Sequence, residues 1–259
     1  MRYSVFNGGK RIRPILSLAG CEAVDGDQNM ALPSGCAIEL IHAFSLIHDD
    51  LPALDNDDLR RGQPTSHKVF GEAIAILAGD ALFARAFEII ADRTRGVPPD
   101  RILDVTRRIA AAAGTGGMVV GQVVDIICEG EQVPEDTLIF MHKNKTGALI
   151  EASVTAGGIL GGGSDAQIEA LSAYGWMVGQ AFQITDDILD IEGDEDKLGK
   201  PVGSDIRNEK TTYPSLYGLE KSRRLADQAI TKALDALCRF DSKAEPLRMI
   251  ARYILDRKS

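Results

Sequence analysis

Residues 40–55 read LIHAFSLIHDDLPALD, an apolar helical pattern that runs directly into three aspartates. The apolar residues recur three and four positions apart, which predicts an amphipathic helix. That helix should end near Pro52, because proline cannot donate a helical hydrogen bond. A second stretch of this kind, AFQITDDILD, occupies residues 181–190. Its Asp186 and Asp190 share one helix face, where two negative charges repel each other unless a cation lies between them.

The two acidic clusters predict a magnesium site that also holds a phosphorylated ligand. Buried carboxylates are costly unless cations neutralise them. Mg²⁺ prefers oxygen ligands and commonly bridges protein carboxylates to substrate phosphates. The candidate ligands are the six aspartates of the clusters, Asp49, Asp50, Asp55, Asp186, Asp187 and Asp190. The alternative, a solvated acidic helix face, is disfavoured by the apolar residues that flank the second cluster. Asp57 and Asp58 are expected to be exposed loop carboxylates.

The rest of the chain predicts an all-α fold in a single domain, residues 1–259. Six segments show helical spacing of their apolar residues: 33–50, 72–94, 100–113, 136–157, 165–191 and 219–240. Breaks rich in Gly, Pro and Asp separate them, and no alternating strand pattern extends beyond a few residues. With 44% hydrophobic and 26% charged residues, the composition is that of an ordinary soluble domain.

Charge and cysteine content narrow the choice of partners and compartment. The net charge of −9 argues against nucleic acid and anionic membranes, so an anionic substrate must be held by local basic groups or metal. The chain starts without an apolar signal-like run, and glycines interrupt its least charged stretch, residues 109–124. These features predict a cytoplasmic protein without a membrane span. The four cysteines lack CxxC spacing and are expected to be buried thiols in a reducing compartment: Cys21, Cys36, Cys128 and Cys238.

Basic residues cluster where they could bind phosphate groups. The loop GGKRIRP, residues 8–14, combines three cations with glycines that let the backbone approach an anion. Arg60 and Arg61 follow the first acidic cluster, and adjacent guanidiniums on a turn could clamp two separate phosphates. Further lysines stand beside glycines and threonines, each of which could equally be a surface lysine: Lys143, Lys145, Lys200 and Lys210.

Three classes of protein are compatible with these residues. The first is a Mg²⁺-dependent enzyme that ionises a diphosphate ester. The second is an HD-type phosphohydrolase, suggested by His42 and the His48–Asp49 pair, which leaves the second aspartate cluster unexplained. The third is a helical scaffold or the inactive regulatory subunit of a heteromeric enzyme. A purely structural helix gains nothing from three aspartates, which favours the first class.

The sequence resembles the short-chain trans-prenyl diphosphate synthases, the farnesyl and geranylgeranyl diphosphate synthase family. The resembling stretches follow the family's order along nearly the whole chain: GGKRIRP (8–14), HAFSLIHDDLPALDNDDLRRGQPTSH (42–67), GEAIAILAGDAL (71–82), GQVVD (121–125), KTGALI (145–150), FQITDDILD (182–190), LGKPVGSD (198–205) and NEKTTYP (208–214). Terpene cyclases share the metal chemistry but lack the GGKRIRP loop and the paired arginines. The resemblance implies a helical bundle around a deep central cavity, and a homodimer. Family members usually carry a further N-terminal helix before the GGK loop, which is expected to be missing here.

The resemblance also implies a reaction, the condensation of isopentenyl diphosphate with dimethylallyl or geranyl diphosphate. Both acidic clusters would hold several Mg²⁺ ions on the allylic diphosphate, with direct contacts from Arg60, Lys145, Lys200 and Lys210. The catalytic residues implied are Arg60, together with the Lys145 carbonyl, Thr146 and Gln183, whose oxygens would face the allylic cation. Isopentenyl diphosphate would bind without metal through Gly9, Lys10, Arg13, His42 and Arg61. Asp125 is expected to orient Arg60.

Product length is expected to depend on Phe44 and Ser45, about one helical turn before Asp49. An aromatic residue at this position resembles the plug of farnesyl diphosphate synthases. The longer first motif, with Pro52 and Ala53 inserted, resembles bacterial farnesyl and plant or cyanobacterial geranylgeranyl enzymes alike. Farnesyl diphosphate is therefore the expected product, and geranylgeranyl diphosphate is the alternative. Ordinary core packing is the other interpretation of Phe44.

Overall fold

The computed structural model describes residues 1–192 and 210–257, and within them the fold is all-α as predicted. Helices of the N-terminal half are α1 (Arg2–Val5), α2 (Ile12–Ala23), α3 (Gln28–Asp49), α4 (Ser66–Phe70), α5 (Glu72–Arg93), α6 (Pro99–Ala113) and α7 (Met118–Ile127). Those that follow are α8 (Glu135–His142), the π-helical segment η1 (Lys143–Gly147), α9 (Ala148–Leu160), α10 (Asp165–Glu192), α13 (Tyr213–Tyr217), α14 (Leu219–Ala236), the 3₁₀ turn η2 (Ser242–Ala244) and α15 (Glu245–Asp256). The described strands are β1 (Leu59–Arg60) and β2 (Gln63–Pro64), which form one antiparallel hairpin.

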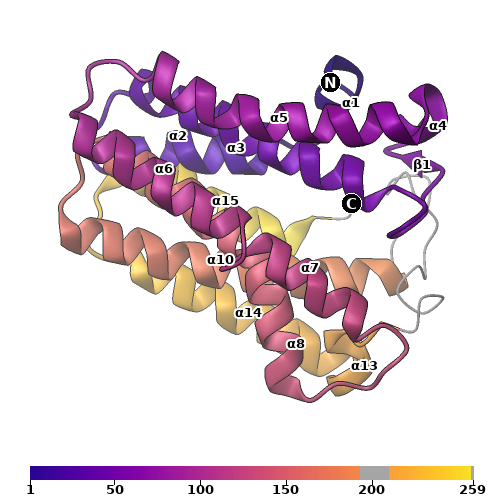
Figure 1. Ribbon diagram of the computed structural model, residues 1–259. Helices are drawn as coiled ribbons and strands as arrows, with labels where there is room; N and C mark the ends of the chain where they lie inside the picture. The colour runs from indigo at the N-terminus through magenta and orange to yellow at the C-terminus, as the bar shows by residue number, and fades with distance from the viewer. Residues whose placement is uncertain (193–209, 258–259) are drawn as a thin grey trace.

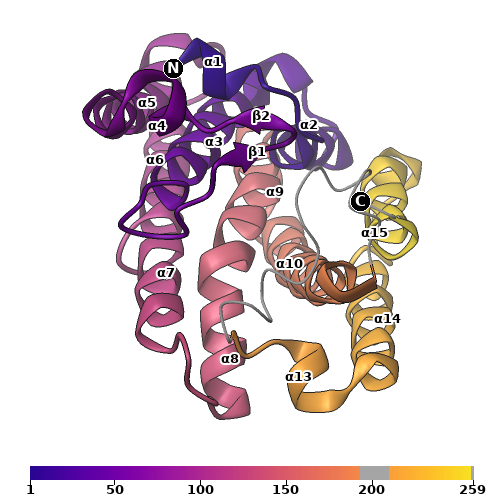
Figure 2. The same cartoon turned by 90° about the vertical axis from the view of Figure 1, so that its right-hand side faces the viewer.

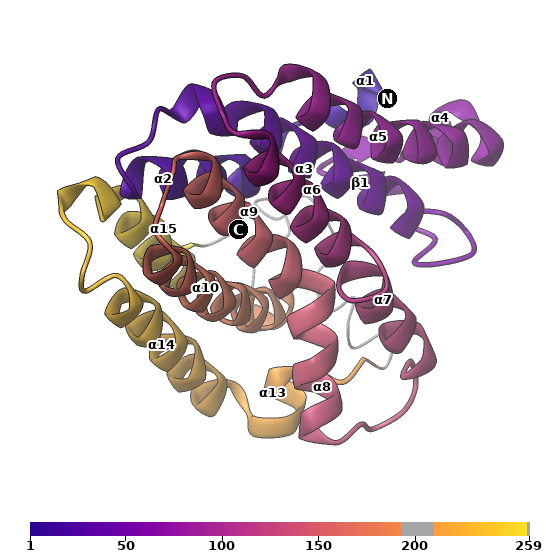
Figure 3. The same ribbon diagram turned by 60° about the vertical axis from the view of Figure 1, so that its left-hand side comes forward.

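Helix α9 is the centre of the bundle. It contacts α2, α3, α6 and α10, and every one of its residues except Glu151 is buried. A helix that is apolar on all sides is stable only inside a protein, which explains this position. Figure 1 shows α3 beside α5 and α10 beside α14, and Figure 3 shows α9 between these two pairs. Each side forms its own apolar cluster against α9.

Small residues let the central helices approach closely. A Cβ on Gly157 of α9 would collide with the Ser17 carbonyl of α2, and a Cβ on Gly20 of α2 would collide with the Val154 carbonyl of α9. Backbones can come this close only where no side chain intervenes. The α2–α9 contact therefore fixes the loop before α2 relative to the rest of the bundle.

Helix boundaries agree with the sequence prediction to within a few residues, with two corrections. Helix α3 begins at Gln28, not at residue 33, because the Asp27 carboxylate caps it by accepting a hydrogen bond from Asn29 N at 2.9 Å. Pro33 therefore lies inside the helix and loses a single bond in its second turn. The predicted helix 136–157 is interrupted by η1 and continues to Leu160.

The π-helical segment has a tertiary cause. Gly121 of α7 faces the Lys145 backbone so closely that an added Cβ would collide with it. On the other side, a Cβ on Gly179 of α10 would lie 2.7 Å from Gly147 Cα. The segment is thus held between two helices by glycine contacts, and π-helical turns often mark functional sites. Lys145 and Thr146 lie within this turn.

Two further expectations are affected by the structure. The cysteines are all free, but only Cys21 is buried, and Cys36 and Cys238 are exposed, so the prediction of four buried thiols was wrong. Among the described residues, Gln28–Asp49 and Pro99–Ile127 are long and apolar enough to cross a membrane. Half of the first span is buried within the bundle, as in core helices of soluble proteins, so this is weak evidence for a span.

Candidate active site

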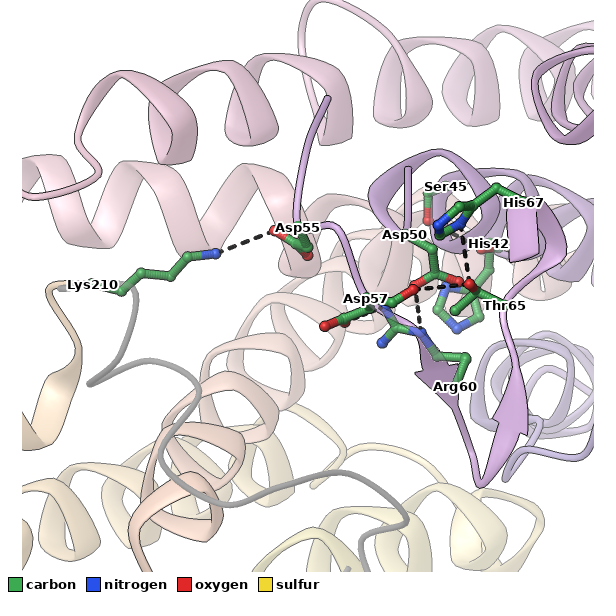
Figure 4. A network of polar contacts seen from close by, with 9 residues as sticks. All are labelled: His42, Ser45, Asp50, Asp55, Asp57, Arg60, Thr65, His67 and Lys210. Carbon is green, nitrogen blue, oxygen red and sulfur yellow. Dashed lines mark hydrogen bonds and ion pairs between the residues drawn. The ribbon is translucent and has the colours of Figure 1, made fainter. Parts of the chain in front are cut away.

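The first acidic cluster lies at the end of α3, where the chain folds back on itself. Asp55 N donates to the Asp49 carbonyl at 2.9 Å, which returns the turn to the helix end. Asp50 is 4% exposed and accepts from Arg60 Nε at 2.9 Å, as Figure 4 shows. Arg60 also pairs with Asp57 at 3.3 Å, so Asp57 is not merely an exposed carboxylate as predicted. The hairpin β1–β2 therefore brings Arg60 onto the first cluster.

Asp49 is the least neutralised carboxylate of this cluster. Burial raises its pKa to about 6, with Asp55 adding to the rise, although the charge of Lys145 acts against both. Burial likewise raises the pKa of Asp50, and the Arg60 guanidinium opposes that rise. The end of α3 thus carries more negative charge than its neighbours offset, and a bound cation would relieve this.

Asp125 joins three parts of the chain that are far apart in sequence. Its Oδ2 accepts from Lys145 Nζ at 2.6 Å and from Lys210 Nζ at 3.2 Å. Lys210 Nζ also lies 3.6 Å from Asp55 Oδ1, and Figure 4 shows the two side chains pointing toward each other. Burial acts to raise the Asp125 pKa, but the two ammonium groups hold it below its usual value. The expected pairing of Asp125 with Arg60 was therefore wrong: Arg60 is held by Asp50 and Asp57 instead.

The aspartates of the second acidic cluster have different hydrogen-bond partners. Asp187, 2% exposed, accepts from Gln183 Nε2 at 2.8 Å and from Tyr213 N at 3.0 Å. Gln183 Oε1 in turn accepts from the Thr146 hydroxyl at 2.7 Å. The two side chains predicted to face the allylic cation therefore lie together. Asp186 instead accepts from Arg257 Nη2 at 2.6 Å. Asp190 is buried on the same helix.

The basic loop before α2 lies against Arg61. Arg61 Nη1 donates to the Gly8 carbonyl at 2.6 Å and to Asn7 Oδ1 at 3.1 Å. Gly9 has a φ of +104°, which favours glycine, and a Cβ there would lie 2.5 Å from the Arg61 guanidinium and would displace it. Adjacent Arg60 and Arg61 thus reach different places, as the sequence predicts.

The same region holds more cations than anions. Burial and the surrounding arginines, Arg13 and Arg61 first, hold the pKa of His42 well below its ordinary value. Burial also lowers the pKa of Arg13, whose Nε has no partner within the described residues. Glu39 pairs with Arg11 at 2.7 Å. A loop rich in cations, with glycines that let its backbone approach an anion, is suited to a diphosphate.

The residues fit Mg²⁺ by chemistry, but they are not arranged around one point. Within 1–192 and 210–257, no three His, Cys, Asp or Glu side chains are close enough together to hold a metal ion. Within the described part of the chain, three of the candidate aspartates pair with protein cations: Asp50 with Arg60, Asp55 with Lys210 and Asp186 with Arg257. The donors are all carboxylate oxygens, which suit Mg²⁺. A bound ion would have to replace these basic partners.

Phe44 belongs to a row of aromatic side chains. Its ring centroid lies 4.8 Å from that of His48 and 5.1 Å from that of Phe83 on α5, and Phe83 lies 5.3 Å from Phe87. The neighbouring Ser45 hydroxyl donates to the His42 carbonyl at 3.0 Å. Phe83 and Phe87 were not identified from the sequence, although their spacing of four on a helix is the available signal. Lys200 and the stretch 198–205 lie outside the described residues.

Comparison with known proteins shows the family to which the chain belongs. A family model described as "Polyprenyl synthetase" matches residues 1–246. The geranylgeranyl diphosphate synthase of Cyanophora paradoxa is 49% identical over all of this chain and 87% of its own. A chloroplastic geranylgeranyl pyrophosphate synthase of Capsicum annuum is 51% identical over 98% of this chain and 69% of its own. An FPP/GFPP synthase structure from Zymomonas mobilis has a TM-score of 0.88 at 44% identity, covering 98% of this chain and 86% of that chain.

Proposed function

Because the chain belongs to the polyprenyl synthetase family of prenyltransferases, we propose that it condenses isopentenyl diphosphate with an allylic diphosphate in a Mg²⁺-dependent reaction. The main product proposed is geranylgeranyl diphosphate. The observation that carries the proposal is the network around Asp125, in which Lys145, Lys210 and Asp55 meet beside the end of α3. It supplies cations and carboxylates to one place, as a diphosphate leaving group bound with metal requires.

In the proposed reaction, the side chains around Asp125 hold the allylic diphosphate. Bound Mg²⁺ would supply positive charge that stabilises the leaving diphosphate, with the acidic clusters as its ligands. Arg60, Lys145 and Lys210 add direct contacts. The allylic carbon–oxygen bond breaks, and its electron pair leaves on the diphosphate. The Thr146–Gln183 pair presents oxygen dipoles to the allylic cation that remains.

The basic loop holds the second substrate. Lys10, Arg13 and Arg61 bind the diphosphate of isopentenyl diphosphate, and uncharged His42 donates a hydrogen bond to it. The double bond of this substrate attacks the allylic cation and forms the new carbon–carbon bond. The proton that is then lost passes to the diphosphate released in the first step.

Two observations bear on product length, and they favour different products. The relatives from Cyanophora paradoxa and Capsicum annuum are both described as geranylgeranyl synthases, which favours the C20 product. Farnesyl diphosphate is the second candidate, because the Phe44–Phe83 contact would limit the room for a longer chain. A homodimer and a cytoplasmic location complete the proposal, the former to be tested by light scattering.

The test is incubation with labelled isopentenyl diphosphate, Mg²⁺ and each of dimethylallyl, geranyl and farnesyl diphosphate, followed by chain-length analysis of the dephosphorylated products. Mainly geranylgeraniol is the expected result. Mainly farnesol would retain the reaction and replace the product by the second candidate. Absence of any product with all three substrates would overturn the proposed function. Asp49→Asn should abolish turnover, whereas the matched change of an exposed aspartate, Asp92→Asn, should leave it intact.

A further inference from the structure

Arg257 connects the end of α15 to the second acidic cluster. Its side chain is 2% exposed, and Nη2 donates both to Asp186 Oδ1 at 2.6 Å and to the Phe182 carbonyl at 2.8 Å. The guanidinium carbon lies 4.0 Å from the centroid of the Phe182 ring. Its Nε is buried without a partner among the described residues. These contacts hold the last turn of α15 against α10, and Figure 2 shows the two helices as neighbours.

The ion pair lies near the basic loop that is proposed to bind isopentenyl diphosphate. The charges of both Arg257 and Asp186 act on Lys10, and the charge of Asp186 also acts on Arg13. Asp186 is therefore close to the basic loop as well as to Asp187 on its own helix. The Asp186 side chain remains 44% exposed, so a cation from solvent can reach it while Arg257 stays covered.

We propose that Arg257 is a positioning residue that competes with a divalent cation for Asp186, and so couples the end of α15 to occupancy of the second acidic cluster. The proposal rests on the proposed function, because it requires a divalent cation beside Asp186. Without the cation, Arg257 is the counter-charge of Asp186 and pins α15. When a cation binds there, two positive charges meet at one carboxylate, the Arg257 contact weakens, and the last turn of α15 loosens.

The arrangement of contacts favours this role over a purely structural one. An arginine that served packing alone would pair with a carboxylate outside the site, as Arg252 does with Glu245 on the same helix at 3.1 Å. Arg257 instead uses a predicted metal ligand. Removing its charge should strengthen cation binding, because no ion pair has to be broken and no guanidinium repels the incoming ion.

The test measures thermal stability while Mg²⁺ is titrated at a fixed saturating concentration of inorganic diphosphate. Ligand that binds only the folded state raises stability by RT ln(1 + L/Kd), where L is the free ligand concentration. The Mg²⁺ concentration that gives a fixed gain in stability, taken as the midpoint, therefore reports the affinity. Arg257→Gln should lower the Mg²⁺ midpoint about tenfold, equivalent to ~1.4 kcal/mol. Arg257→Lys, which keeps the charge, should stay near the wild-type midpoint. The matched control Arg252→Gln, one turn earlier in α15, should leave the midpoint unchanged.

A second measurement, hydrogen exchange of the peptide at 252–257, follows α15 directly. In the wild type, Mg²⁺ with diphosphate should speed exchange there, whereas in Arg257→Gln exchange should already be fast without Mg²⁺. An unchanged or raised midpoint in Arg257→Gln, or slower wild-type exchange on adding Mg²⁺, would overturn the proposal. If Arg257→Gln fails to fold, the wild-type exchange decides. If the wild type gains no stability from Mg²⁺ and diphosphate, this inference fails, and the product assay decides separately whether the proposed function stands.

Discussion

Replacing Asp125 by Asn should destabilise the ligand-free protein far more than a single surface charge would. The carboxylate is buried and holds two ammonium groups, Lys145 at 2.6 Å and Lys210 at 3.2 Å. Charge-assisted hydrogen bonds contribute roughly 1.5–3 kcal/mol each, and the lysines remain partly solvated. We therefore expect a loss of about 3 kcal/mol in the free energy of unfolding. For a chain of this length, that corresponds to a fall of roughly 6–12 °C in melting temperature.

The pH dependence of this loss has a definite sign. The pKa of Asp125 is lowered in the folded protein from its ordinary value of 3.8, so the unfolded chain binds more protons in acid. The stabilisation is present above that value and is lost as the pH falls through the folded-state pKa. The free energies of unfolding of the wild type and of Asp125→Asn should differ by the full amount near pH 7 and become equal in strong acid. Chemical denaturation over this pH range measures both the stability loss and its pH dependence.

Inorganic diphosphate provides a second check, because it can replace Asp125 as the counter-charge of the two lysines. Adding it should narrow the gap in melting temperature between Asp125→Asn and the wild type. The matched control is Asp104→Asn, since Asp104 also holds two cations, Arg107 at 2.7 Å and Arg108 at 2.9 Å, but on the surface of α6. Asp104→Asn should lower the free energy of unfolding by less than about 1 kcal/mol. A loss at Asp125 no larger than that at Asp104 would refute the reasoning.

Three other outcomes follow from the site. Phe44→Ala should lengthen the products by at least one isoprene unit, and Phe83→Ala should act in the same direction because its ring lies against Phe44; an unchanged product distribution in both would contradict this. Gly9→Ala should displace Arg61 and raise KM for isopentenyl diphosphate about tenfold, ~1.4 kcal/mol, with KM for the allylic substrate unchanged in steady-state assays. Mg²⁺ affinity should weaken as the pH falls below about 6, where Asp49 takes up a proton, and calorimetry of Asp49→Asn should show a flatter dependence.

Much of the fold was predictable because helices in this chain bury one face or are buried entirely. The predicted helix 72–94 corresponds to α5, Glu72–Arg93, since its apolar spacing is set by the face that packs on α3. The π-helical segment at Lys143–Gly147 could not be predicted, because it depends on glycine contacts with Gly121 and Gly179 from distant helices. Apolar periodicity does not distinguish one long helix from two joined by a wider turn.

For the candidate site too, part was predictable from the sequence and part was not. The identity of the acidic and basic groups was evident from the sequence, because carboxylates inside apolar helices and cations beside glycines are unusual enough to indicate chemistry. Their pairing was not evident. Asp125 was expected to hold Arg60, and it holds Lys145 and Lys210 instead. Side chains from separate helices meet according to how those helices pack, which local spacing does not encode.

The sequence by itself determined an all-α bundle, two aspartate clusters, and a family whose members share that set of motifs in order. Only the tertiary structure decided which cation neutralises which carboxylate. Asp186 and Arg257 are far apart along the chain, yet the packing of α15 on α10 brings them within 2.6 Å. Helix formation depends on neighbours a few residues away, whereas an ion pair of this kind depends on where whole helices come to lie.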